Sequence, residues 1–125
     1  MHSPVNEHLA IETLDHEDGT VELRLATGPE HTNEVGIVHG GLTSFLLDGA
    51  MGRAVGRTLE EGGICGTTQL SVQFLERATG TLSAIGRVTK RGRTVAFAEA
   101  ECRRSDDGAL VARAHGTWFV KEPRA

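Results

Sequence analysis

The sequence predicts an α+β domain in which one long helix lies against an antiparallel sheet of five or six strands. Residues 41–61 show helical apolar periodicity, and segments on both sides of them alternate with the period of two typical of strands. Each connection after the helix carries a glycine of the kind that tight hairpins use. One helix among hairpin-linked strands indicates an α+β domain.

The bulk composition fits one ordinary domain, which we expect to span residues 1–125. Of these residues 38% are hydrophobic and 24% are charged, as in folded globular proteins. Aromatic residues make up only 4%. We therefore expect the core to rest on Leu, Val, Ile, Ala and the four Phe, and to gain from burial against a partner subunit.

The net charge and the cysteines indicate which classes of partner and cofactor to expect. A net charge of −4 gives no general attraction for nucleic acid or an anionic membrane. We find no signal-peptide pattern and no apolar run long enough to span a bilayer. Cys65 and Cys102 lack metal-ligand spacing, which predicts free buried thiols in a reducing cytoplasm. We expect neither nucleic acid nor membrane as a partner, and no metal or cofactor.

The expected helix carries a stripe of glycines beside its apolar stripe. Gly49, Gly52 and Gly56 recur at helical spacing, although each costs roughly 1 kcal/mol relative to Ala. We infer that a sheet packs very close to them. The expected strands are two segments within residues 9–27, around a turn at 15–19, and four segments at 67–75, 82–90, 94–103 and 110–121. Residues 30–38 are expected to form a loop.

His39-Gly40-Gly41 stands where the loop meets the helix. The first N–H groups of a helix lack intrahelical partners, and glycines let a ligand approach them. Such N–H groups suit a polarised carbonyl or a developing oxyanion. The alternative is a glycine-rich helix start without chemistry.

Asp48 lies inside the apolar helix, which indicates either a solvated face or a carboxylate that acts as base or nucleophile on an ester or thioester. Gly40 and Asp48 are eight residues apart, which is about 12 Å along one helix. One carbonyl cannot reach both. If both act in one site, they belong to different subunits, and the protein is a dimer.

Other polar residues are weaker candidates. Asn33 is either a turn former or a group that orients a carbonyl or a water, and Thr67 at the start of a strand is either a β former or a hydroxyl beside that water. The ring of His39 is either a base or a structural group. The turn Lys90-Arg91-Gly92-Arg93 is either a solvated edge or a contact for phosphates.

Taken together, these segments resemble the hotdog-fold thioesterases, of the phenylacetate-degradation and 4-hydroxybenzoyl-CoA type. The resemblance covers roughly residues 30–120. It rests on Asn33-x-x-Gly36-x-Val38-His39-Gly40-Gly41, Asp48-Gly-Ala-Met-Gly52, Thr67-x-x-Leu70-Ser71-Val72-x-Phe74-Leu75 and the glycine-containing hairpins that follow.

The resemblance implies hydrolysis of an aryl- or medium-chain acyl-CoA to a free acid and CoA. It implies that Asp48 is base or nucleophile and that the Gly40 N–H polarises the carbonyl. Asn33 and Thr67 would orient the carbonyl or the water. It also implies dimers that join their sheets, often paired into tetramers.

Further site residues follow from the same comparison. Gly41 would adjoin the substrate, and Lys90, Arg91 and Arg93 would meet the CoA phosphates. The alternative function is a non-catalytic acyl-CoA-binding hotdog domain, which would have no need of Asp48. A hotdog hydratase ranks last, because its acid/base pair is not found in the loop before the helix.

Overall fold

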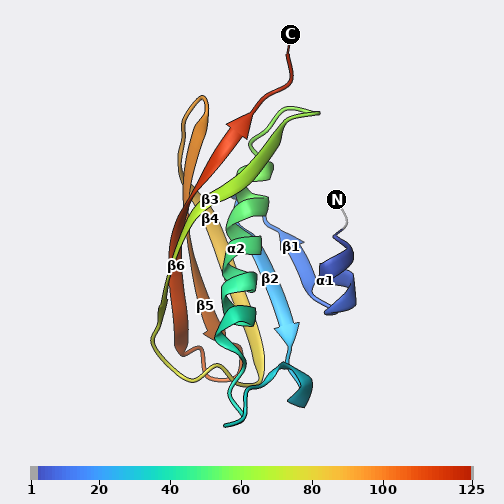
Figure 1. Cartoon of the computed structure of the whole chain (residues 1–125), viewed down its shortest axis with the longest axis vertical. Helices are drawn as coiled ribbons and strands as arrows, with labels where there is room; N and C mark the ends of the chain where they lie inside the picture. Colours follow the sequence, from blue (N-terminus) through green and yellow to red (C-terminus); the bar gives the residue numbers. More distant parts are fainter. Residues whose placement is uncertain (1–2, 125) are drawn as a thin grey trace.

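The predicted α+β architecture is confirmed in a computed structural model of the chain, which describes residues 3–124. One long helix lies along the concave face of a curved six-stranded antiparallel sheet (Figure 1). The strand order is β1-β2-β4-β5-β6-β3. The elements are α1 (Pro4–His8), β1 (Glu12–Asp15), β2 (Val21–Ala26), the 3-10 helix η1 (Pro29–His31), α2 (Gly40–Gly56), β3 (Ile64–Phe74), β4 (Thr81–Arg91), β5 (Val95–Arg104) and β6 (Leu110–Lys121).

The main helix ends earlier than the predicted residue 61. Beyond Gly56 the chain tightens into a turn, where the Thr58 N–H donates to the Val55 carbonyl at 2.9 Å. The Thr58 hydroxyl donates to the same carbonyl at 2.6 Å. This side-chain bond competes with continuation of the helix. The short helices α1 and η1 were not predicted. The expected domain of residues 1–125 includes residues 1, 2 and 125, which lie outside the described residues.

The core lies between α2 and the sheet and contains no phenylalanine. Its side chains are Leu, Val, Ala and Met with Cys102 and Trp118. Phe45 is half-buried, and Phe74, Phe97 and Phe119 are 42–58% exposed. The expectation that Ile and Phe build the core is therefore wrong. The core consists mainly of small and branched side chains around Trp118, and the phenylalanine rings are half-buried or exposed.

The close approach of sheet and helix is confirmed, but its tightest point lies on the sheet. A Cβ at Gly86 in β4 would lie 2.6 Å from the carbonyl carbon of Ala50. On the helix, a Cβ at Gly49 would meet Leu23 at 2.7 Å, whereas Gly56 has nothing within 4 Å. The glycine stripe therefore marks close packing only in part.

The two edges of the sheet differ. β1 is four residues long, and its Asp15 accepts two hydrogen bonds from Arg53 of α2, at 2.8 and 2.7 Å. The Arg53 guanidinium holds the pKa of Asp15 below its usual value. β3 is eleven residues long, and its outer side pairs with no strand of residues 3–124. A long edge of this kind is a template for pairing with another chain.

In the part of the chain described, none of the helices is long and apolar enough to cross a membrane.

Candidate active site

Asp48 and Thr67 are brought together at the β3 side of the helix. The Thr67 hydroxyl donates a hydrogen bond to Asp48 Oδ1 at 2.8 Å. Asp48 is half-buried, and no basic side chain of residues 3–124 pairs with it. Oδ1 is therefore oriented by a neutral donor, and Oδ2 remains able to accept from a water. This arrangement suits a carboxylate that takes a proton from a nucleophile.

A β-bulge puts Thr67 beside Asp48. In the register with β6, Thr67 lies opposite Trp118 and Gln69 lies opposite Thr117, so Thr68 is an extra residue. Without the extra residue, the period of two along a strand would place Thr67 on the face away from Leu70. The extra residue shifts the alternation by one, so Thr67 shares the helix-facing side of β3 with Leu70.

One backbone N–H group at the start of α2 has no hydrogen-bond acceptor within residues 3–124. The Nδ1 atom of His39, the N-cap residue, accepts from the Gly41 N–H at 2.9 Å. The His39 carbonyl accepts from the N–H groups of Leu42 and Thr43 at 2.9 and 3.2 Å. Within residues 3–124, the Gly40 N–H alone among these four has no acceptor. The N–H predicted to polarise a carbonyl is therefore available, whereas that of Gly41 is used.

Phe74 flanks Gly40. A Cβ built on Gly40 would lie 3.3 Å from two ring atoms of Phe74, so the ring packs against the glycine. The ring is otherwise 58% exposed. The sequence carries no signal of this contact, because it depends on how β3 crosses the helix.

The side chain of Asn33 forms hydrogen bonds within its own loop. Its Oδ1 accepts from the N–H groups of Val35 and Ile37 at 3.1 and 3.2 Å, and the Gly36 N–H donates to its carbonyl at 3.0 Å. These bonds shape the turn that leads into His39. The amide NH2 of Asn33 makes no hydrogen bond with residues 3–124 and is the part of this side chain able to meet a substrate.

The basic turn lies near the far end of the helix. Arg91 donates to Glu122 at 2.6 Å and to the Thr58 hydroxyl at 3.0 Å. Its guanidinium is therefore already hydrogen-bonded within the chain. Lys90 and Arg93 are exposed. Thr58 is ten residues beyond Asp48, or roughly 15 Å at helical rise. Within one chain the turn therefore lies nearer to Asp48 than to Gly40, which is eight residues further back along the helix.

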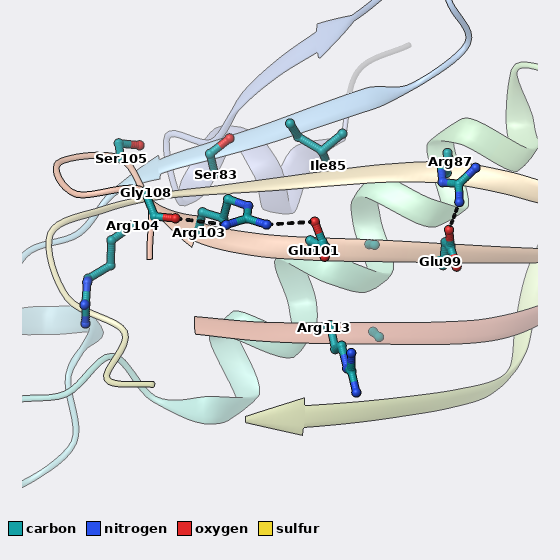
Figure 2. A pocket seen from close by; sticks show the side chains of 12 residues that line it. Ser83, Ile85, Arg87, Glu99, Glu101, Arg103, Arg104, Ser105, Gly108 and Arg113 are labelled. Carbon is teal, nitrogen blue, oxygen red and sulfur yellow. Dashed lines mark hydrogen bonds and ion pairs between the residues drawn. The ribbon is translucent and has the colours of Figure 1, made fainter. Parts of the chain in front are cut away.

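A broad depression of about 610 Å³ lies on the outer face of the sheet, opposite the helix (Figure 2). Ion pairs Arg87–Glu99 and Arg103–Glu101 cross it. It contains none of the predicted site residues. The candidate residues lie elsewhere: Asp48 and Thr67 are joined by a hydrogen bond, and His39 and Gly40 form the helix start. Asn33 lies in the loop that precedes them and is not joined to either pair by a hydrogen bond within residues 3–124.

Comparison with known proteins decides the family. The model of the family described as "Thioesterase superfamily" matches residues 35–111, which include Gly40, Asp48 and Thr67. The chain belongs to the thioesterase superfamily. The predicted resemblance is thereby confirmed at the level of the superfamily, and its helix-and-sheet fold agrees with the solved structures of relatives.

Several relatives of this thioesterase-superfamily chain are known. The BH2602 protein of Bacillus halodurans, whose crystal structure contains CoA, is 33% identical, with a TM-score of 0.88 over 98% of this chain and 82% of that one. Human acyl-coenzyme A thioesterase 13 is 29% identical over 79% of this chain and 71% of that protein. "Putative esterase F42H10.6" of Caenorhabditis elegans is 37% identical over 70% of this chain. The matched region is only about half of that esterase, 53% of its length.

Proposed function

We propose that this thioesterase-superfamily chain hydrolyses an acyl-CoA thioester to the free acid and CoA, with an aryl or a medium-chain acyl group. Asp48 takes the proton from a water, and the Gly40 N–H of the other subunit binds the carbonyl oxygen. The observation that carries the proposal is the pair of complementary groups: a carboxylate oriented by Thr67 at 2.8 Å and an N–H at the helix start without an acceptor in residues 3–124.

The reaction balances with these groups alone. Asp48 removes a proton from water while the oxygen forms a bond to the thioester carbon. The π electrons move to the carbonyl oxygen, where the Gly40 N–H stabilises the negative charge. Collapse of this intermediate breaks the C–S bond, and the proton held by Asp48 returns to the leaving thiolate. Direct attack by the carboxylate, through an anhydride, remains the alternative route.

A two-fold axis through the β3 edge supplies the second subunit. Residues that face each other in an antiparallel pair lie on the same side of the sheet. Because of the bulge at Thr68, the positions on the helix-facing side are Thr67, Leu70, Val72 and Phe74. The pairing therefore has to match these positions with one another across the axis.

With Ser71 on the axis and the bulged Thr68 left out of the pairing, Phe74 of each chain faces the partner's Thr67. Phe74 packs against Gly40, and Thr67 bonds to Asp48. This register therefore brings Gly40 of one chain to the Asp48 of its partner, twice per dimer. It also covers Leu70 and Phe74, which are 37% and 58% exposed in the single chain.

A cysteine at position 71 tests this register. We expect Ser71→Cys to form an intersubunit disulfide under mild oxidation, because side chains directly opposite each other have Cβ atoms about 5 Å apart. Gln73→Cys on the same face is the matched control, since the register pairs it with Gln69 and not with itself. Non-reducing electrophoresis reads the result, with wild type as the background for Cys65 and Cys102. Cross-linking of Gln73→Cys but not of Ser71→Cys contradicts the register.

We further propose that two dimers associate through the outer faces of their sheets in the cytoplasm, where the free Cys65 and Cys102 stay reduced. Phe97 and Phe119 are exposed on that face, and its arginines and glutamates carry both charge signs (Figure 2). Light scattering is expected to give the mass of four chains. A mass of two chains at all concentrations rules out this second contact.

Thiol release from a panel of acyl-CoAs tests the function. We expect turnover on the order of 1 s⁻¹ or faster for at least one of benzoyl-, phenylacetyl-, hexanoyl- and decanoyl-CoA. No cofactor is added, because CoA is part of the substrate. Tight binding of all four without thiol release would instead support the non-catalytic acyl-CoA-binding alternative.

A further inference from the structure

His39 occupies the N-cap position of α2, where Ser, Thr, Asp and Asn are the usual residues. Its Nδ1 accepts from the Gly41 N–H at 2.9 Å, the bond that a Ser or Asp oxygen ordinarily accepts. The backbone before it is fixed by the bond from the His39 N–H to the His31 carbonyl, at 2.9 Å. The imidazole ring therefore makes the N-cap hydrogen bond that a short polar side chain usually makes.

The glycine at the second helical position, Gly41, makes room for the ring of His39. A Cβ on Gly41 would lie 3.0 Å from Nδ1 and 3.2 Å from Cε1 of His39, closer than side chains normally approach. Gly41 thus leaves room for the ring, and its N–H donates the capping hydrogen bond to His39. The two residues together leave the Gly40 N–H as the donor without an acceptor in residues 3–124.

The hydrogen bond at Nδ1 also argues against His39 as a general base. Because Nδ1 accepts, the neutral ring carries its proton on Nε2. Nε2 is then a donor, and the single lone pair able to take a proton is engaged by Gly41. No carboxylate of residues 3–124 pairs with this ring. A His39 in this state holds the turn and has no free base to offer a water.

We propose that His39 is a positioning residue whose value is to cap the helix without a negative charge. An Asp at this position would cap at least as well, because anions are favoured at helix N-termini. Its carboxylate would, however, lie one residue from the Gly40 N–H, where negative charge develops on the carbonyl oxygen. A neutral cap does not reduce the positive electrostatic potential that the helix N-terminus produces at that oxygen.

This inference rests on the proposed function, and three variants test it. His39→Asn keeps a neutral cap, His39→Asp gives an anionic cap and His39→Ala gives none. We expect thermal stability to be lowest for His39→Ala, with His39→Asp at least as stable as His39→Asn. We expect kcat of His39→Asp to fall at least about tenfold below that of His39→Asn. A purely structural role would instead move kcat and stability together.

Two results overturn the inference: equal kcat for the Asn and Asp variants, or a His39→Ala protein as stable as His39→Asn. Failure of the proposed function looks different, since wild type itself would then release no thiol from any acyl-CoA. The stability order of the three variants still reports on the cap in that case. A KM that changes equally in the Asn and Asp variants while kcat differs locates the effect in the transition state.

Discussion

Asp48→Asn is expected to lower kcat for acyl-CoA hydrolysis by roughly 10²- to 10⁴-fold, the usual contribution of a positioned general base. The amide keeps the size of the carboxylate, and its oxygen still accepts the hydrogen bond that Thr67 donates to Oδ1 at 2.8 Å. The fold and the dimer should therefore survive. Initial rates of thiol release, with circular dichroism and light scattering on the same sample, measure the effect.

Thr67→Val is the companion variant. It removes one hydrogen bond from a hydroxyl to the Asp48 carboxylate, so we expect a smaller loss, roughly ten- to a hundredfold, in keeping with the energy of such a bond. In a single turnover of wild type in ¹⁸O-labelled water, the base route puts the label only into the acid. Label in Asp48 identifies the anhydride route, with water attacking the aspartyl carbon of the anhydride. Undiminished turnover in Asp48→Asn would rule out either role for this carboxylate.

Gly40→Pro is expected to lower kcat about 10²-fold or more relative to Gly40→Ala, because an oxyanion donor contributes on that scale. Gly40 is the first helical residue, where proline is well tolerated. His39 has φ −55° and ψ 132°, the extended conformation that a residue before proline prefers. The proline therefore removes little besides the N–H.

Gly40→Ala measures what the added side chain costs on its own. Both variants place a Cβ 3.3 Å from the ring of Phe74, so any displacement of that ring is common to the two proteins. Thermal melting checks that the two proteins are equally folded. If Gly40→Pro and Gly40→Ala have the same kcat, the Gly40 N–H does not polarise the carbonyl.

Local signals were sufficient to predict the architecture. Alternation and hairpin glycines such as Gly80 and Gly108, both with positive φ, gave the strands, and apolar periodicity gave α2. The core was predicted less well. Periodicity marks which side of an element is buried, but not how near the sheet lies. The approach of Gly86 to Ala50 leaves no space for a side chain at that point and is set by packing across the whole domain.

The sequence pointed to candidate residues for the site but not to their arrangement. Helical rise alone separated Gly40 from Asp48. The contact between Thr67 and Asp48 depends on an extra residue at Thr68, and no turn signal announces such a bulge inside a strand. The packing of Phe74 on Gly40 likewise follows from the tertiary path of β3.

The central claim is that each active site takes Gly40 from one chain and Asp48 from its partner. A heterodimer of Asp48→Asn and Gly40→Pro chains, purified through two different tags, tests it directly. One of its sites would have both groups intact and the other neither, so we expect about half the wild-type activity per dimer, far above either parent homodimer. Activity no higher than that of the parents would show that the two groups do not act across the interface.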